Sequence, residues 1–239
     1  LFRRTHRGVE LTAYGMALYE STCDIKRALE KSERKLLAMR QGASGKVTIG
    51  AGTIPGEYIL PSVLPSFLNE HPDVSISLIS ADSQSIFKLW QEGKVPICVI
   101  GFFPQGVSNA CEIWEDEIIP VVSPKMPLAE TPLNSMDFLR YPLVFRHASS
   151  ASMEVVREAL KNIGISSEEC NIVLHVSGNE ALKTAVMYGT GIGFVSKRAV
   201  EKELAEGTLL QVFVEGLQIK RSFYALRNAD MEMPVTLAL

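Results

Sequence analysis

The sequence of 239 residues contains no long uninterrupted run of apolar side chains. A helix that crosses a bilayer needs about 18 or more consecutive apolar residues, so we expect no membrane-spanning segment and no membrane partner. The start also lacks the form of a secretory signal peptide, because its charged residues are followed by VELTAYGMALYE (9–20), which is not an apolar stretch. The sequence therefore disfavours membrane and exported classes of protein.

Closely spaced cysteines are also missing. No two of the four cysteines form a Cys-x-x-Cys motif (Cys23, Cys98, Cys111 and Cys170). Structural zinc sites and redox pairs normally need such spacing, so we expect no metal site and no redox-active disulfide. Scattered thiols fit a reducing compartment, which points to the cytoplasm.

The sequence shows no recognisable catalytic constellation. None of its four histidines has a serine or cysteine partner at a recognised spacing (His6, His71, His147 and His175). The segment GTGIG (189–193) is superficially similar to a dinucleotide-binding loop, but it lies between an expected helix and a following strand, which is the reverse of that motif. We therefore expect no enzyme activity and no cofactor.

Charge is unevenly distributed along the chain, whose net charge is −3. Residues 1–40 contain nine Lys or Arg and five Asp or Glu, a net charge of +4, so the remainder carries −7. A solvated helix face explains the charges of residues 26–40, but Arg3, Arg4 and Arg7 precede the expected helix. An acidic body with a basic leader indicates that a polyanion contacts the leader.

A long helix is expected from Thr12, a residue type that caps helices, to about residue 40, because this stretch has no proline and one glycine. Apolar and small polar residues recur there at spacings of 4-3-4-3-4, as in a coiled-coil seam (Leu18, Thr22, Ile25, Leu29, Ser32 and Leu36). Its length would be about 42 Å at ~1.5 Å per residue. We expect self-association through residues 12–40, followed by a flexible linker, QGASG (41–45).

After this linker the pattern alternates between strands and helices. The expected strands are 46–51, 73–80, 95–102, 117–124, 143–146, 172–177, 191–196, 208–215 and 220–228. The expected helices are 57–71, 83–93, 152–164, 179–189 and 197–207. This alternation predicts an α/β fold with a parallel sheet covered by helices, in two units of similar size that divide near residue 117.

The opening segment LFRRTHRGVELTAYG (1–15) carries a specific motif. Eight of its positions resemble the wing and linker start of LysR-type transcriptional regulators (Leu1, Phe2, Arg4, Arg7, Gly8, Leu11, Thr12 and Gly15). GKVTIG (45–50), ILPSVLPSFLNEHPDV (59–74) and EALKTAVMYGTGIGFVSKRAV (180–200) are similar to three further family stretches in the same order. The resemblance therefore covers the whole chain.

The resemblance implies the remnant of a winged helix-turn-helix (1–12), a linker and dimerisation helix (13–42) and a two-lobed effector domain like a type 2 periplasmic binding protein. Lobe I would comprise residues 43–117 and 219–239, and lobe II residues 118–218. The recognition helix of such a protein would precede Leu1, and MPVTLAL (233–239) looks like the start of a last helix.

The same resemblance places the basic hairpin against DNA, as the wing. Basic side chains there would neutralise phosphates or enter the minor groove, an attraction that is independent of base sequence and weakens with salt. We assign these contacts to Arg3, Arg4, Arg7 and Thr12.

In such two-lobed folds a small ligand lies between the lobes and is held by helix N-termini, whose unpaired N–H groups suit anions. In lobe I the candidates are the Thr53 hydroxyl, the backbone N–H groups that start at Ile54, Ser83 and Phe102. Thr53 has an alternative role as a helix cap, either Asp82 or Ser83 is the cap of the following helix, and Phe102 is equally compatible with core packing.

In lobe II the segment RHASSASM (146–153) resembles a family motif, Arg-Glu-x-Gly-Ser-Gly-Thr-Arg, of a branch associated with sulfur and selenium metabolism and carbon fixation. It keeps the arginine and two hydroxyls but departs at His147, Ser149, Ala151 and Met153, which puts that branch's effector in doubt. We assign Arg146, Ser149, Ser150 and Ser152 to the effector, with Asn179 from the next helix start. The alternative is a serine-rich helix cap.

Three functions are compatible with these features. The first is a transcriptional regulator whose partners are promoter DNA, a second copy of the chain, and a small effector, either an anion or a small carboxylate. The second is a solute-binding protein of a small-anion uptake system, which would not need the basic hairpin or the long helix. The third, an enzyme on a similar scaffold, lacks a catalytic constellation.

Overall fold

A computed structural model describes residues 1–5, 8–41, 45–71, 74–128, 132–147 and 150–228. Internal contacts divide these residues into two compact units. The first unit holds residues 1–47 and 71–75, and the second holds residues 48–70 and 76–228. We describe each unit by itself. Within the described residues, no helix combines the length and the apolar character that a bilayer crossing requires.

The first unit contains a hairpin and a long helix. Strands β1 (Phe2–Thr5) and β2 (Gly8–Leu11) pair antiparallel, with Phe2 opposite Leu11. Helix α1 (Ala13–Gln41) follows directly. The Gly15 backbone N–H donates to Thr12 Oγ1 at 3.1 Å, which confirms the predicted cap. A Cβ on Gly15 would fall on the carbonyl oxygen of Leu1, so the hairpin can fold back onto the helix start only at glycine.

In the second unit the described strands form a single mixed sheet in the order β4-β3-β5-β11-β6-β9-β7-β8, with β10 paired to β6. Neighbours β3 and β5, β7 and β8, and β7 and β9 are parallel, and the pairs that involve β6 or β11 are antiparallel. The bounds are β3 (Lys46–Gly52), β4 (Ser75–Ala81), β5 (Ile97–Ile100), β6 (Cys111–Val122), β7 (Leu143–Arg146), β8 (Ile172–Val176), β9 (Ile192–Ser196), β10 (Leu210–Gln211) and β11 (Lys220–Arg227).

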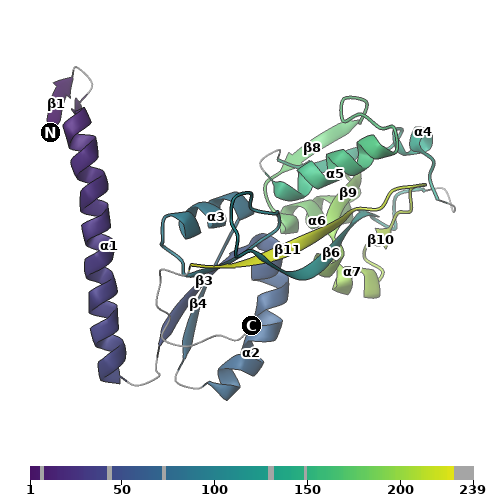
Figure 1. Ribbon diagram of the computed structural model, residues 1–239. Coiled ribbons are helices and arrows are strands. Elements are labelled where there is room, and N and C mark those ends of the chain that lie inside the picture. The colour runs from purple at the N-terminus through teal and green to yellow at the C-terminus, as the bar shows by residue number, and fades with distance from the viewer. Residues whose placement is uncertain (6–7, 42–44, 72–73, 129–131, 148–149, 229–239) are drawn as a thin grey trace. The chain divides into compact units, whose positions relative to one another are not determined.

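Two strands, β6 and β11, join the two halves of this sheet (Figure 1). The first part of β6 pairs with β11, and its last part, from Ile118 to Val121, pairs with β9. We call β3, β4, β5 and their helices half I, and β7, β8, β9 and their helices half II. Half I carries the π-helical turn η1 (Pro55–Ile59), α2 (Leu60–Glu70) and α3 (Ser83–Gln91). Half II carries α4 (Ser135–Phe138), α5 (Ala151–Asn162), α6 (Asn179–Met187), the 3-10 turn η2 (Lys197–Ala199) and α7 (Glu201–Ala205).

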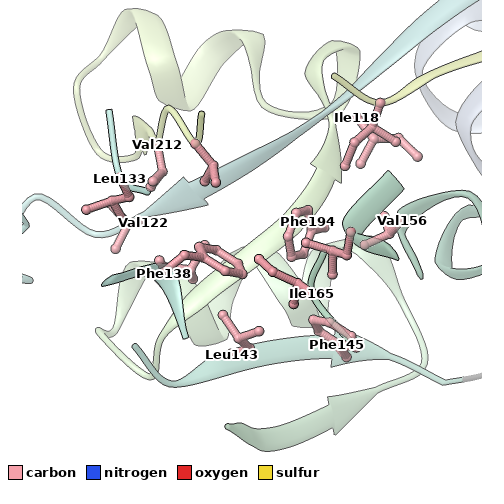
Figure 2. Packing of buried hydrophobic residues seen from close by; sticks show 14 of the residues in the cluster. Ile118, Val122, Leu133, Phe138, Leu143, Phe145, Val156, Ile165, Phe194 and Val212 are labelled. Carbon is pink, nitrogen blue, oxygen red and sulfur yellow. The ribbon is translucent and has the colours of Figure 1, made fainter. Parts of the chain in front are cut away.

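Each half has its own hydrophobic core. In half I, Ile86 of α3 packs with Val95, Cys98, Ile100 and Leu226. In half II, the rings of Phe138 and Phe145 both lie edge-on to Phe194, with ring centroids 6.1 and 5.8 Å apart (Figure 2). This cluster is larger and takes side chains from α5 and from the segment before β11. Burial of these apolar side chains is what holds the helices on the sheet.

The glycines of GTGIG (189–193) have structural roles. Gly189 adopts a positive φ of +85° just after α6, a conformation that favours glycine and ends helices. A Cβ on Gly193 would lie 2.6 Å from Val186 Cγ2 and 2.8 Å from Leu182 Cδ2. Helix α6 can therefore pack this closely against β9 only because residue 193 is glycine. The segment therefore serves helix–sheet packing.

Several predicted boundaries were wrong for physical reasons. The strand expected at 208–215 is limited to Leu210–Gln211, because Phe213 and Glu215 instead bond through their backbones to Leu133. Strand β6 begins at Cys111 rather than at residue 117. The single helix expected over 197–207 is divided into η2 and α7.

The half II core generates a stability prediction. We expect Phe145→Ala to lower the free energy of unfolding by about 3–5 kcal/mol, because it opens a cavity beneath Phe194. Phe213→Ala is the matched control, since Phe145 is 0% and Phe213 63% exposed, and should cost less than about 1 kcal/mol. Urea denaturation of both variants measures the difference, and equal losses would contradict the assignment of the core.

Candidate functional site

The most unusual buried group of the second unit is the guanidinium of Arg146, at the end of β7. Arg146 is only 7% exposed. Its Nη1 donates to Asn179 Oδ1 at 3.0 Å and, at 3.5 Å, to Ser152 Oγ, and its Nη2 donates to the Ser177 carbonyl oxygen at 3.2 Å. All three acceptors are neutral, so no negative charge on these partners compensates the buried cation.

Two polar atoms of this cluster are without hydrogen-bond partners in the described structure. Arg146 Nε and Asn179 Nδ2 are both buried and both unsatisfied. Buried polar groups are almost always paired, and leaving one unpaired costs about 1–3 kcal/mol. Two orphan donors on side chains that are bonded to each other mark a place where an acceptor is expected.

Electrostatics relate this cluster to half I. Burial lowers the pKa of Arg146, and the nearby guanidinium of Arg221 lowers it further, whereas Glu57, Tyr58 and Asp82 raise it. The last three residues belong to η1 and to the start of α3. Arg146 therefore lies within electrostatic range of both helix starts of half I.

Two serines at the start of α5 flank Arg146. Ser150 occupies the N-cap position, but its side chain makes no capping hydrogen bond. Its hydroxyl instead lies 2.7 Å from that of Ser152. The capping alternative is therefore not realised by the Ser150 side chain, and the hydroxyl pair lies beside the guanidinium. Ser149, also predicted, lies outside the described residues.

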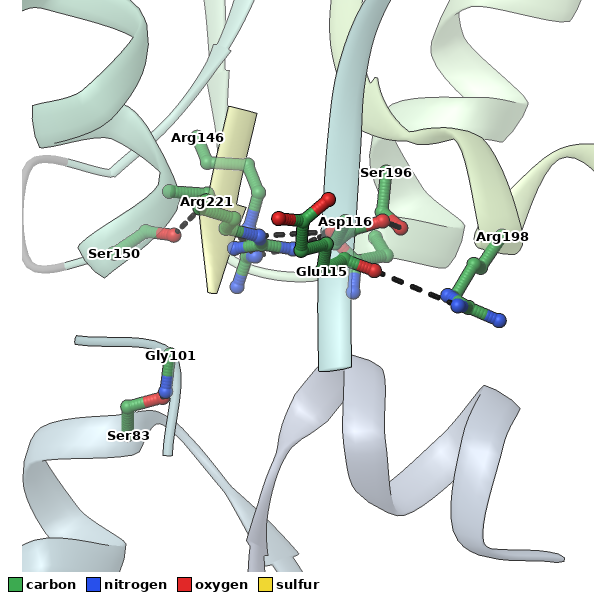
Figure 3. A network of polar contacts seen from close by, with 11 residues as sticks. Ser83, Gly101, Glu115, Asp116, Arg146, Ser150, Ser196, Arg198 and Arg221 are labelled. Atoms are coloured by element: carbon green, nitrogen blue, oxygen red, sulfur yellow. Dashed lines mark hydrogen bonds and ion pairs between the residues drawn. The ribbon is translucent and has the colours of Figure 1, made fainter. Parts of the chain in front are cut away.

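The predicted site residues of half I have different structural roles. Asp82 caps α3 by accepting from the Ser85 backbone N–H at 2.9 Å. Ser83 is thus not the cap, and its Oγ accepts from the Gly101 N–H at 3.1 Å (Figure 3). Thr53 is half-buried at the end of β3, and Ile54 is buried.

Phe102 packs into the half I core. Its ring lies edge-on to Phe87, with centroids 5.6 Å apart, and belongs to the apolar side chains around Ile86. This is the packing role that the sequence left open beside a ligand contact.

A second buried arginine, Arg221 of β11, was not predicted as a site residue. Its Nε and Nη2 both donate to Asp116 Oδ2 of β6, at 2.8 and 2.7 Å, and Ser196 Oγ donates to Asp116 Oδ1 at 2.7 Å. Burial lowers the pKa of Arg221, and Asp116 opposes that shift. Figure 3 shows the Arg221 and Arg146 head groups beside each other. The Asp116 carboxylate is therefore occupied by Arg221 and Ser196.

The structure thus brings Arg146, Ser150, Ser152 and Asn179 together, as predicted for lobe II. Among the described residues, no hydrogen bond joins these side chains to Thr53, Ser83 or Phe102, and the assignment of all of them to one ligand stays a prediction. The candidates for DNA contact belong to the first unit: Arg3 and Arg4 are exposed on β1, Thr12 caps α1, and Arg7 lies outside the described residues.

Comparison with known proteins assigns the family. Residues 40–239 match the model of the LysR substrate-binding domain. An uncharacterized HTH-type transcriptional regulator of Methanocaldococcus jannaschii, MJ0300, is 29% identical over 235 residues, which are 98% of this chain and 79% of that protein. A probable RuBisCO transcriptional regulator of Trieres chinensis is 28% identical over 237 residues, which are 96% of this chain and 77% of that protein.

A solved structure shares the fold of the second unit. The regulatory domain of Synechocystis PCC6803 CcmR, in complex with 2-PG, matches with a TM-score of 0.70 at 19% identity, over 79% of this chain and 90% of that one. The match to the family model covers most of the sequence, and the two relatives are named as regulators of transcription. The chain belongs to the LysR family of transcriptional regulators, and residues 40–239 are its substrate-binding domain.

Proposed function

We propose that the second unit binds a small anionic effector between two lobes, and that this binding modulates DNA binding by the regulator. The observation that carries the proposal is the buried guanidinium of Arg146, which bonds only neutral acceptors and leaves Nε unsatisfied. A buried charge whose direct hydrogen-bond partners are all neutral is costly. An anion would supply both the missing acceptor and the missing charge.

The chemistry around Arg146 favours a carboxylate or an oxyanion. A guanidinium binds such groups through two parallel N–H donors. Nδ2 of Asn179 and the hydroxyls of Ser150 and Ser152 offer further donors at the starts of α6 and α5, where helix N-termini add partial positive charge. The similar CcmR domain was solved with 2-PG, which agrees with a small ligand in this fold.

Half I supplies the opposite wall in this proposal. Thr53 and the N–H groups from Ile54 onward begin a helix, Ser83 begins α3 after its cap, and Phe102 contributes through packing. Halves I and II then correspond to lobe I (43–117 and 219–239) and lobe II (118–218). An effector that contacts both lobes can shift their arrangement only through its different affinity for the two arrangements.

The first unit favours a regulator over a solute-binding protein. A basic hairpin with exposed Arg3 and Arg4 suits phosphate contacts, and the long helix α1 exposes Leu18, Ile25 and Leu29. We propose that these three side chains form the seam of a homodimer. A second contact between copies would join two dimers into a tetramer. In this proposal the partners are promoter DNA, a second copy of the chain and the effector, and the protein is cytoplasmic and is not an enzyme.

The effector class is tested by a thermal-shift screen with sulfate, sulfite, thiosulfate, selenite, phosphate, 2-PG and small carboxylates. A ligand at about 100 times its dissociation constant adds about 2.7 kcal/mol of stability, so we expect a selective rise in melting temperature. Arg146→Gln should abolish the rise. Arg140→Gln, which changes a largely exposed arginine, should preserve it. A rise that survives Arg146→Gln, or no rise with any anion, contradicts the proposal.

The two buried arginines are expected to differ in the ligand-free chain. Arg221→Met strands the buried carboxylate of Asp116 and should cost about 3–5 kcal/mol. Arg146→Met strands only neutral acceptors and should cost about 1–3 kcal/mol. Denaturant unfolding of the two variants in an anion-free buffer measures the difference. If Arg146→Met proves the more damaging, Arg146 is a structural residue and not a ligand anchor.

Self-association through α1 gives a third test. Ile25→Lys should shift the chain toward the monomer in analytical ultracentrifugation, because a charge enters the apolar seam. Met16→Lys is the matched control: Met16 is also exposed, but it is nine positions away, about two and a half turns, and so lies on the opposite face. If both substitutions shift the chain toward the monomer equally, the proposal that the seam is the dimer interface is contradicted.

A further inference from the structure

A hydrogen bond joins the two halves of the second unit outside the β6–β11 crossing. Tyr58, on η1 of half I, donates its hydroxyl to Glu180 Oε1, on α6 of half II, at 2.5 Å. The two residues are 122 positions apart in the sequence. The turns η1 and η2 also contact each other, so the bond is part of a direct contact between the halves.

A buried lysine holds the acceptor of this bond in place. The Lys183 side chain is 7% exposed, and its Nζ lies 2.8 Å from Glu180 Oε1 and 2.8 Å from Glu203 Oε1. Nζ also donates to the Ala199 carbonyl oxygen at 3.0 Å and lies 5.6 Å from the centre of the Tyr58 ring. These contacts fix Glu180 in position and keep its charge balanced.

The bond and the proposed anion site meet at the first turn of α6. Asn179 and Glu180 are its first two residues. Asn179 accepts from Arg146, and Glu180 accepts from Tyr58. Glu57 and Tyr58 also act electrostatically on Arg146. A displacement of the first turn of α6 would therefore alter both sets of contacts.

We propose that Tyr58 and Glu180 form a latch between half I and half II, that Lys183 is its positioning residue, and that the latch sets the affinity of the anion site. The effect on affinity rests on the proposed function, whereas the latch itself does not. When the latch is closed, the Glu180 carboxylate is held by Tyr58 and Lys183. When the latch opens, half I moves away from Asn179 and Arg146, and an anion loses the donors of one side.

The ionisation of the two latch residues agrees with a closed bond. Burial raises the pKa of Tyr58, and the hydrogen bond to Glu180 raises it further, so the phenol keeps its proton. Burial also raises the pKa of Glu180, but hydrogen bonds from Lys183 and Tyr58 outweigh burial and leave that pKa below its usual value. The pair is thus a neutral donor on a charged acceptor, which is stronger than a bond between neutral groups.

Nitration of tyrosines by tetranitromethane tests the latch in the ligand-free chain. The reagent attacks exposed phenolates, and Tyr188, 84% exposed, is an internal reference in the same molecule. Mass spectrometry of peptides gives the ratio of the two nitration rates. We expect Tyr58 to react at least tenfold more slowly than Tyr188 in the wild-type chain, and Glu180→Ala to remove most of that protection.

Three further variants make the nitration test specific. Glu206→Ala, an exposed carboxylate on the same half, should leave the protection of Tyr58 unchanged. Lys183→Met should reduce it, and Lys183→Arg should restore it, because the arginine keeps a cation beside Glu180. Equal nitration of Tyr58 and Tyr188 in the wild-type chain, or full protection of Tyr58 in Glu180→Ala, would overturn the latch. If Lys183→Met does not fold, the comparison of Glu180→Ala with Glu206→Ala still decides.

Affinity measurements test the coupling to the anion site, with inorganic phosphate and 2-PG as probes in isothermal titration calorimetry. We expect Tyr58→Phe to weaken binding about tenfold, as loss of a charge-assisted hydrogen bond implies, and Tyr188→Phe to leave it unchanged. Unchanged affinity in Tyr58→Phe would overturn the coupling. If neither probe binds the wild-type chain, the proposed function fails for these anions, and the nitration ratio still decides whether the latch exists.

Discussion

The buried ion pair between Arg221 and Asp116 is the interaction on which the second unit depends. It joins β11 to β6, the two strands that run between the halves, and both side chains are almost fully removed from water (8% and 0% exposed). Buried charges persist only when they are closely paired and hydrogen-bonded. Two bonds from Arg221 and one from Ser196 satisfy the carboxylate. Sliding one strand along the other would break them, so the pair fixes the register at the crossing.

This constraint shapes the electrostatics of the site beside it. Arg221 donates two hydrogen bonds to the Asp116 carboxylate. Arg146, in contrast, donates its hydrogen bonds only to neutral acceptors. Two arginines of similar burial therefore differ: Arg221 pairs with a carboxylate within the fold, whereas Arg146 has only neutral hydrogen-bond partners and one unsatisfied donor. Burial lowers the pKa of Arg146, and the charge of Arg221 lowers it further.

The sequence carried enough information for most of the architecture and for one side of the site. Strong alternation and turn residues located most strands and helices, and the motif at 146–153 singled out Arg146, Ser150 and Ser152. The pairing of Arg221 with Asp116 was not predicted, because the two residues are 105 positions apart in the sequence and meet only when β6 and β11 pair in the sheet. A signal was present: Asp116 occupies a position two residues from both Trp114 and Ile118, where alternation calls for an apolar side chain. The carboxylates in CEIWEDE (111–117) also concealed the first half of β6.

The position of the site at the start of α6 has a consequence for any anionic ligand. A helix N-terminus favours negative charge, and Glu180 already places a carboxylate in that first turn. An anion bound at Asn179 would therefore be repelled by Glu180 unless that carboxylate were held elsewhere. Lys183, Tyr58 and the position of half I provide that hold. In the proposed site, the electrostatics of anion binding would depend on the contact between Tyr58 and Glu180 that joins the two halves, and this would couple the charge of the ligand to the arrangement of the lobes.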